Sequence, residues 1–248
     1  MELFAVPGLP EVQPGDDLAG LVADRTELAD GDVLCVASTV VSKAEGRVYE
    51  YADFPAGERA RAIADHLEAV TGDEKDPRFA QAVLEESEEL LTEAPFLLAV
   101  TRFGHITVNA GIDRSNVPDG DLLLLPEDPS ASAQRLSERL DVPVVVTDTS
   151  GRPFRYGQRG VAVGWAGLPA SRDWRGERDR DGRELGVTVQ SVVDELAGAA
   201  NLVAGEGDDG TPAVVVRDWS FGDHDGSNNL FRADEDDIVR AALRDWSF

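Results

Sequence analysis

Short apolar runs rich in valine and leucine recur along the chain, and glycine, proline or aspartate bounds most of them. Runs of this length and composition predict β-strands. Because only Gly104 separates the third run from the fourth, these two predict a hairpin. The expected strands span residues 2–6, 32–42, 96–103, 105–111, 122–126, 142–148, 161–167 and 213–218.

Segments with apolar residues at helical spacing lie between these runs. An aspartate followed by proline, at 76–77 and again at 128–129, is typical of a helix start. Further helices are expected at 58–70 and at 188–203, the second ending at Gly205. Helices combined with a hairpin favour an α+β fold, with mixed sheets and packed helices, over a doubly wound parallel sheet.

No linker rich in proline, glycine or serine divides the chain, and only residues 166–187 and 219–236 look irregular. No apolar stretch approaches the roughly 20 residues that cross a bilayer, and the first residues lack the pattern of a signal peptide. A cytoplasmic protein without membrane partners is therefore expected. Cys35, the single cysteine, lies in an apolar run, which predicts a small buried side chain and excludes a disulfide framework.

Charge is the strongest compositional signal, with 48 acidic residues against 23 lysines and arginines and a formal net charge of −25. Most of such a surface repels nucleic acid, and no basic stripe interleaved with aromatic residues appears. The acidic residues are spread along the chain, and lysine occurs only at positions 43 and 75. This pattern favours a halophilic protein adapted to a salty cytoplasm over one with an acidic patch for a basic partner.

Several familiar signatures are missing, among them the phosphate-binding loop of P-loop enzymes, the dinucleotide-binding glycine motif and the nucleophile elbow. His66, His105 and His224 are scattered along the chain, so we expect them to be structural or exposed. Histidine catalysis is therefore not predicted.

Four polar clusters occur at expected strand ends, where mixed α and β proteins often place their sites. Ser38, Thr39 and Lys43 follow the run VLCVA, and a lysine beside hydroxyls in a lysine-poor chain is a candidate phosphate contact. A solvated lysine remains the alternative. The glycine-rich segment 205–212 precedes the last expected strand and could bring backbone amides to a phosphate, although a helix cap and turn explain it equally well.

The other two clusters contain aspartate. Asp113 and Asn116 lie in the stretch VNAGIDRSNV, and Asp148 and Thr149 follow the run VPVVV. Carboxylate and hydroxyl oxygens suit Mg²⁺ or Mn²⁺, as does Glu206 in the glycine-rich segment. For either aspartate taken alone, an Asx turn is the alternative.

Six blocks of the sequence, in this order, resemble the coenzyme F420-0 gamma-glutamyl ligases. They begin with GLPEVQPGDDL, ASTVVSKAEGR and AVLEESEELL, and continue with VNAGIDRSNV, TDTSGRPFR and the long block from Asp179 to Asp218. The resemblance implies a two-lobed ligase architecture over residues 1–218, with 219–248 as an acidic C-terminal segment of the same unit. It also implies a stand-alone, archaeal-type enzyme that forms a homodimer.

The same resemblance assigns site residues. It implies that one divalent ion is held by Asp113 and Asp148, and a second by Thr149 and Glu206. It implies that GTP is held by Leu9, Pro10, Glu11, Val12, Ser38, Thr39, Lys43, Asn116, Ala204, Gly205, Glu206, Gly207, Asp208, Asp209, Gly210 and Thr211. Arg152, Arg155 and Arg159 are candidates for binding substrate carboxylates or phosphates, because arginine pairs with such groups bidentately. The resemblance identifies no catalytic base.

The implied reaction spends GTP to join L-glutamate to the deazaflavin coenzyme F420-0, through an acyl phosphate, and then adds further glutamates by γ-linkage. Its cofactors would be Mg²⁺ or Mn²⁺, and a monovalent cation such as K⁺ is a further candidate. The alternative from another functional class is a nucleotide- or deazaflavin-binding protein that has lost ligation. The presence of Asp113, Asp148, Thr149 and Glu206 favours the working ligase.

The excess of acidic residues predicts that salt stabilises the fold. Repulsion between like charges reaches about 30 Å at 0.01 M salt and only about 3 Å at 1 M, and compaction of the chain raises this repulsion above its value in the unfolded state. The thermal midpoint measured in a KCl series should therefore rise toward molar salt. A midpoint that stays flat or falls between roughly 0.1 and 2 M, where screening changes strongly, would instead indicate that the acidic surface serves a partner.

Overall fold

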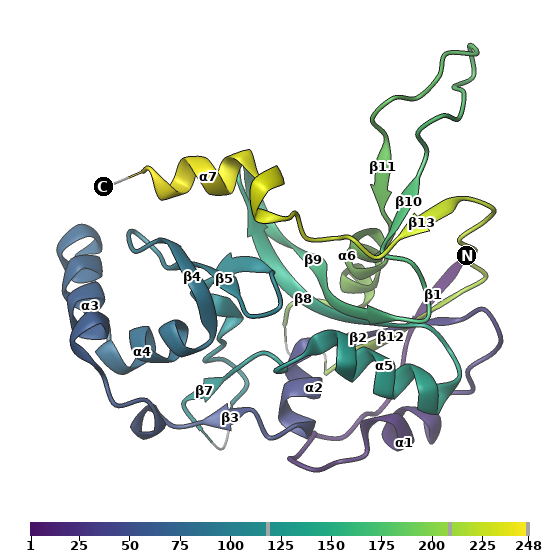
Figure 1. The fold of residues 1–248 in the computed structure, drawn as a ribbon. Helices are drawn as coiled ribbons and strands as arrows, with labels where there is room; N and C mark the ends of the chain where they lie inside the picture. Colours follow the sequence, from purple (N-terminus) through teal and green to yellow (C-terminus); the bar gives the residue numbers. More distant parts are fainter. Residues whose placement is uncertain (118–119, 208–209, 247–248) are drawn as a thin grey trace. The chain divides into compact units, whose positions relative to one another are not determined.

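A computed structural model describes residues 1–117, 120–207 and 210–246. The chain divides into two compact units, and it passes between them three times. Unit 1 comprises Met1–Ala44 and Asp128–Leu230, and unit 2 comprises Glu45–Glu127 and Phe231–Phe248. Both contain helices and antiparallel strand pairs, which confirms the expected α+β class (Figure 1). None of the described helices is both long enough and apolar enough to cross a bilayer.

The centre of unit 1 is a five-stranded sheet in the order β1-β12-β2-β8-β9. Its strands are β1 (Glu2–Ala5), β2 (Val33–Ala37), β8 (Val144–Arg152), β9 (Arg155–Ala166) and β12 (Ala213–Arg217). The pair β2–β8 is parallel and the other pairs are antiparallel. Three of the five expected strand runs of unit 1 are confirmed as strands, at 2–6, 142–148 and 213–218. Strand β9 begins before the expected run 161–167, and only the first part of the run 32–42 is a strand.

Helices cover both faces of this sheet (Figure 1). Helix α6 (Val192–Ala204) packs on the face that carries Val33, Cys35 and Val145. Helices α1 (Leu18–Ala23) and α5 (Pro129–Leu140) pack against each other, and α5 packs on β8 and β9. Cys35 is buried as predicted, and burial raises the pKa of its thiol to about 12. The continuous valine runs thus reflect strands that are buried on both faces.

Two glycines of β9 allow this close packing. A Cβ atom on Gly160 would lie 2.4 Å from the carbonyl oxygen of Ala197 in α6, and one on Gly164 would lie 2.3 Å from the carbonyl carbon of Pro129 in α5. A register shift opposite Val146 and Thr147 separates the two glycines along the strand. Such a bulge reverses which face the following residues occupy, so β9 meets a helix on each side.

Two expectations about element boundaries are wrong. The run 32–42 is not one strand, because β2 ends at Ala37 and α2 (Ser38–Ala44) begins directly after it. The helix expected at 188–203 begins later, at Val192. Residues Val189–Ser191 instead form strand β11, whose backbone pairs with Ser171–Asp173, so tertiary pairing overrides the helical spacing of the valines.

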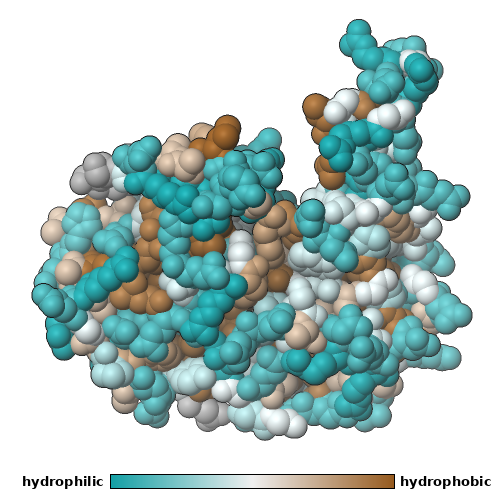
Figure 2. All heavy atoms as spheres, in the orientation of Figure 1, coloured by the Kyte–Doolittle hydropathy of each residue, from teal (hydrophilic) through white to brown (hydrophobic). Residues whose placement is uncertain are grey.

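The segments expected to be irregular contain strands that only long-range pairing reveals. Strand β10 (Ser171–Asp173) lies between β11 (Val189–Ser191) and β13 (Asp225–Ser227). Residues 174–188 form an extended hairpin arm that projects from this small sheet and is covered mainly by hydrophilic side chains (Figures 1 and 2). At its base, Arg172 lies over the rings of Trp174, Trp219 and Phe221. The sequence RDWSF occurs at 217–221 and again at 244–248, and its first copy supplies two of these three rings.

Unit 2 contains two small antiparallel sheets and its own core. One sheet pairs β3 (Val48–Tyr49) with β7 (Leu122–Leu123), and the other has the order β4 (Ser87–Thr92), β5 (Leu98–Thr101), β6 (Ile106–Val108). The predicted hairpin is confirmed as β5–β6. Helices α3 (Glu58–Thr71) and α4 (Pro77–Glu85) begin close to the expected residues and pack together, and Asp76 caps α4 as predicted. Short 3₁₀ turns occur at η1 (Tyr51–Asp53), η2 (Asn109–Gly111) and η3 (Asp234–Asp236).

The C-terminal helix α7 (Ile238–Arg244) is tied to β4 by charge. Arg240 and Arg244 both donate hydrogen bonds to the carboxylate of Glu89, and both pair with Asp234. The hydrogen bond from Arg244, followed by that from Arg240, lowers the pKa of Glu89 to about 2. Arg217 and Arg244 begin the two copies of RDWSF, and these two arginines pair with different carboxylates.

An ion pair between a buried aspartate and a half-buried arginine connects β12 to the turn before β2. Arg217 donates to Oδ1 of Asp32 at 2.9 Å and to Oδ2 at 2.6 Å, and the Asp32 residue is 1% exposed. The arginine also donates to the carbonyl of Glu27. The hydrogen bond from Arg217 is the main reason that the pKa of Asp32 lies below its ordinary value.

Removing this charge should destabilise the protein. Asp32→Asn leaves Arg217 without its carboxylate and should lower the free energy of unfolding by roughly 2 to 4 kcal/mol, near the range for breaking a buried pair. Because the pKa is lowered on folding, the contribution of Asp32 is present above the unfolded pKa and disappears as the pH falls below it. Urea unfolding from pH 7 to pH 3 measures both effects.

Arg59→Gln is the control, since Arg59 forms an exposed pair with Glu93. Its loss should change stability by less than about 1 kcal/mol. Equal effects of the two substitutions would contradict a special role for the buried pair.

Candidate functional site

Four segments of unit 1 converge at one end of the five-stranded sheet. The register aligns Ala5 with Val214 and Val36 with Ala213, and it aligns Ala37 with Thr147. The chain therefore leaves β1 and β2, and enters β12, at the same end of the sheet, which is called the sheet edge below. The segments at this edge are 6–12, 38–43, 147–149 and 204–212, and they contain all the candidate nucleotide and metal residues except those in 113–116 and those outside the described residues.

Lys43 is buried in this region and not solvated. It lies in the last turn of α2 and is 8% exposed, and its amine forms an ion pair with the Glu11 carboxylate. This pair joins the segment Leu9–Val12 to the helix that follows β2. Burying the ammonium group of one of only two lysines requires a compensating charge, which Glu11 supplies.

Asp148 faces the start of the same helix. The hydroxyl of Ser38 donates a hydrogen bond to Oδ1 of Asp148 at 3.2 Å, so a buried serine just after β2 is linked to the middle of the parallel strand β8. Thr149 follows Asp148 in β8 and is half-buried, as is Thr39 in α2. The structure thus brings together Ser38 and Asp148, two residues that sequence analysis placed in separate clusters.

The loop after α6 begins with the predicted glycine. Gly205 has a positive φ of 74° and ends the helix, donating its backbone amide to the carbonyl of Asn201. The side chain of Asn201 also donates to Oε1 of Glu206 at 2.9 Å. Ala204 is half-buried and Gly205, Glu206, Gly207 and Gly210 are exposed, so the loop presents backbone to solvent. Asp208 and Asp209 lie outside the described residues, and Thr211 leads into β12 through Pro212.

Asp113 and Asn116 belong to unit 2. Asp113 pairs through its backbone with Leu123, and its Oδ1 accepts hydrogen bonds from the amide and the hydroxyl of Ser115, both at 2.8 Å. This geometry is the Asx turn that the sequence left open. Asn116 is exposed and has a left-handed backbone, with φ of 55°. The turn orients the Asp113 carboxylate and leaves Oδ2 with a single described partner, the Ser115 hydroxyl.

The three candidate arginines lie along the β8–β9 hairpin of unit 1. Arg155 and Arg159 are exposed, whereas Arg152 is half-buried at the register position opposite Arg155. The Nε atom of Arg152 is buried and has no hydrogen-bond partner among the described residues. A donor of this kind is costly unless a ligand or water accepts from it.

The donor atoms fit a hard divalent cation, although they do not form a complete protein cage. Among the residues that the structure describes, no group of three or more His, Cys, Asp and Glu side chains could hold a metal ion. Asp148, Thr149 and the neighbouring Ser38 nevertheless supply only oxygen donors. Mg²⁺ binds through one or two carboxylates and completes its shell with phosphate and water oxygens, so this donor set is sufficient for such an ion.

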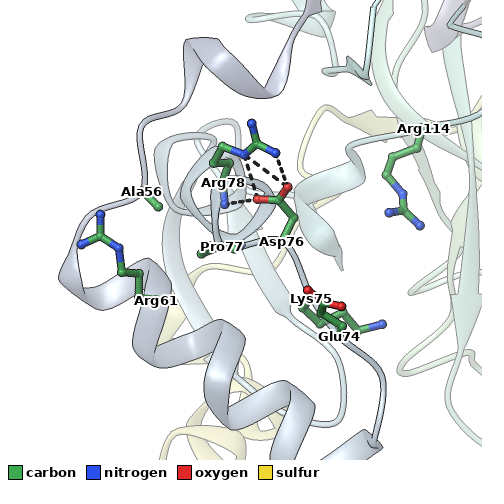
Figure 3. A pocket seen from close by; sticks show the side chains of 8 residues that line it. All are labelled: Ala56, Arg61, Glu74, Lys75, Asp76, Pro77, Arg78 and Arg114. Carbon is green, nitrogen blue, oxygen red and sulfur yellow. Dashed lines mark hydrogen bonds and ion pairs between the residues drawn. The ribbon is translucent and has the colours of Figure 1, made fainter.

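Sequence analysis missed a basic pocket in unit 2. Its cavity has a volume of about 640 Å³, and six charged residues contribute to its lining: Arg61, Glu74, Lys75, Asp76, Arg78 and Arg114 (Figure 3). One of only two lysines in the chain is among them. Because cations are scarce in this chain, each one was a candidate for binding an anion. These residues come from three separate segments, however, and only the fold brings them together.

Comparison with known proteins gives relatives along the whole chain. A relative from Natronomonas pharaonis is 79% identical over 248 residues, which cover 100% of this chain and 98% of the relative. A relative from Archaeoglobus fulgidus is 48% identical over 250 residues, with 98% of each chain covered. One from Methanosarcina barkeri is 43% identical over 251 residues, with 98% of this chain and 96% of the relative covered. All three carry the name coenzyme F420:L-glutamate ligase.

The family model F420-0:Gamma-glutamyl ligase matches residues 8–218. This range contains the four segments at the sheet edge of unit 1 from Gly8 onward, and it also contains the 113–116 turn of unit 2. The resemblance found in the six sequence blocks is therefore confirmed, and the chain belongs to the F420-0:gamma-glutamyl ligase family.

Proposed function

We propose that this chain is a GTP-dependent ligase that joins L-glutamate to the deazaflavin coenzyme F420-0. Family membership supports the ligase activity and its two substrates. The observation that carries the proposal is the convergence of segments 6–12, 38–43, 147–149 and 204–212 at one edge of a sheet. That edge gathers hydroxyls, a lysine, a carboxylate and an exposed glycine-rich backbone, which are the groups that a metal-bound nucleotide requires.

The reaction takes place in two transfers. The terminal carboxylate of the F420-0 side chain attacks the γ-phosphorus of GTP, forming an acyl phosphate and releasing GDP. The amine of glutamate then attacks the acyl carbon, inorganic phosphate leaves, and the nitrogen loses a proton. Activation is needed because a carboxylate is a poor electrophile, while phosphate is a good leaving group.

Residues of unit 1 bind and orient the nucleotide in this proposal. The hydroxyls of Ser38 and Thr39 lie at the beginning of α2, and Lys43 lies in its last turn. All three side chains can contact phosphate oxygens. The exposed backbone of Gly205, Gly207 and Gly210 can approach the nucleotide closely, because these residues have no side chains. Asn116, from unit 2, is assigned a nucleotide contact by its place in the family motif alone.

In this proposal Asp113 and Asp148 would hold one Mg²⁺ or Mn²⁺ ion, and Thr149 and Glu206 would hold a second. When bound, each ion offsets the charge of the phosphates during transfer. The unpartnered Nε of Arg152 can donate a hydrogen bond to a carboxylate or phosphate oxygen of a substrate. Each of these positive groups matters more in a chain with a net charge of −25, because GTP, coenzyme and glutamate are all anions.

The proposal includes repeated addition of glutamate by γ-linkage, a homodimer, a cytoplasmic location and a supporting monovalent cation such as K⁺. A non-catalytic nucleotide- or deazaflavin-binding protein remains the competing function. Incubating the purified protein in concentrated KCl with F420-0, glutamate, Mn²⁺ and either GTP, ATP or no nucleotide separates the two. A product heavier by one glutamate residue, formed with GTP only, supports the ligase, and binding of GTP without product supports the alternative.

Removing a metal-binding carboxylate should abolish ligation but not folding. Asp113→Asn and Asp148→Asn should each lower turnover by at least about a hundredfold, comparable with losing a main electrostatic contact to the transition state. The affinity for Mn²⁺, measured by calorimetry without substrate, should fall in parallel. Asp30→Asn, in an exposed turn before β2, is the control. Near-normal turnover or unchanged Mn²⁺ binding in either variant would refute its role.

Lys43→Ala should weaken GTP binding by about 1.5 to 3 kcal/mol, the range for a hydrogen bond to a charged group. Because Lys43 also pairs with Glu11, the companion variant Glu11→Gln removes the ion pair and keeps the amine. Equilibrium titration with GTP should show the larger loss in Lys43→Ala. If both variants lose the same affinity, or neither does, Lys43 has only a structural role.

A further inference from the structure

The basic pocket of unit 2 is built from three separate segments. Arg61 lies in the first turn of α3, residues 74–78 lead into α4, and Arg114 follows η2 (Figure 3). Arg61 and Arg114 lie on opposite sides of the pocket in Figure 3. The volume of about 640 Å³ is within the range of small-molecule sites.

The charges of this pocket differ from those of the rest of the chain. Four cationic and two acidic side chains line it, whereas acidic residues outnumber lysines and arginines by 48 to 23 in the sequence as a whole. A local excess of positive charge in such a background attracts anions that the remaining surface repels.

The cations of the pocket are not all engaged by protein carboxylates. Arg78 is fixed by Asp76, with N–O distances between 2.6 and 3.2 Å, and its guanidinium lies over Tyr51. Lys75 approaches Asp73 at only 3.9 Å. Arg61 and Arg114 form no ion pair with any described residue, and Arg114 instead lies over the ring of Phe79. Two guanidinium groups are therefore available to a ligand.

We infer that this pocket binds the carboxylates of a γ-linked oligoglutamate tail on the substrate or product. The inference rests on the proposed function, in which glutamates are added one after another. Such a tail carries one free α-carboxylate per residue and another at its end, so its charges are spaced along a chain. Separate cations on opposite walls suit spaced carboxylates, and arginine binds each carboxylate bidentately.

Arg114 is next in sequence to a residue of the proposed ligation site. Arg114 directly follows Asp113, the proposed metal ligand, and the Asx turn from Asp113 to Ser115 fixes the backbone on which both side chains lie. A tail held at Arg114 would thus be anchored one residue from a group that acts on its reacting end. Triphosphate is a poorer candidate, because the described residues that line the pocket include no glycine.

The test is direct binding of synthetic γ-linked triglutamate to the intact protein, without nucleotide and at a fixed KCl concentration at which circular dichroism shows a folded chain. The double variant Arg61→Gln/Arg114→Gln should bind the peptide about tenfold or more weakly, since each contact is a charge-assisted pair at a partly exposed site. The matched control is Arg59→Gln, from the same helix as Arg61 but paired with Glu93 outside the pocket. It should bind like the unaltered protein.

Competition distinguishes the possible sources of anionic groups. Free L-glutamate and inorganic phosphate should displace the peptide only at far higher concentration, because neither spans both arginines. Displacement by phosphate at equal concentration would make the pocket a phosphate site, and equal displacement by L-glutamate would make it a site for the single amino acid. Either result overturns the inference, as does an unchanged affinity in the double variant.

Product analysis gives a second readout. In the ligation assay, the double variant should shift the product distribution toward a single added glutamate, and Arg59→Gln should not. Peptide binding requires no turnover, so its failure is separate from failure of the proposed function. Peptide binding without ligation would support the tail subsite and refute the ligase. Ligation without peptide binding would support the ligase and refute the tail subsite.

Discussion

The insertion of β12 between β1 and β2 is the pairing on which unit 1 depends. It joins the first and the last strands of the five-stranded sheet, in chain order, through backbone hydrogen bonds, and it places the glycine-rich loop beside the end of β2. The pair Arg217–Asp32 holds the far end of the same strand. Without this insertion, no strand pairing would bring the loop at 204–212 next to the hydroxyls of α2. The candidate nucleotide site is thus a product of strand order.

Several of the few cations in this chain join segments that are distant in sequence. Lys43 and Arg240 are largely buried against carboxylates, and Arg217 joins two segments that are distant in sequence. Such pairs are costly to bury but also costly to break, so they specify which segments meet. The cations that remain without carboxylate partners among the described residues, including Arg61 and Arg114, therefore stand out as candidates for contact with anionic ligands.

The sequence predicted the α+β class, most of the strand runs of unit 1, the β5–β6 hairpin and the aspartate caps of α4 and α5, because these depend on local patterns. It misassigned Val189–Ser191 and missed β10 and β13, since those short strands exist only through pairing with one another. It placed Ser38 and Asp148 at strand ends but could not pair them without knowing that β2 and β8 are parallel neighbours. The basic pocket could not be predicted from the sequence for the same reason, because its cations come from three segments.

The discontinuous composition of the two units constrains how the chain is made. Synthesis proceeds from the N-terminus, so β1 emerges from the ribosome about 200 residues before its sole sheet neighbour, β12. Until then β1 is a strand without a partner, and the apolar edge of β2 is uncovered on one side. Unit 2 in turn receives α7 only with the last residues. Nascent chains of this protein must therefore remain incomplete, with exposed strand edges, for nearly the whole of translation.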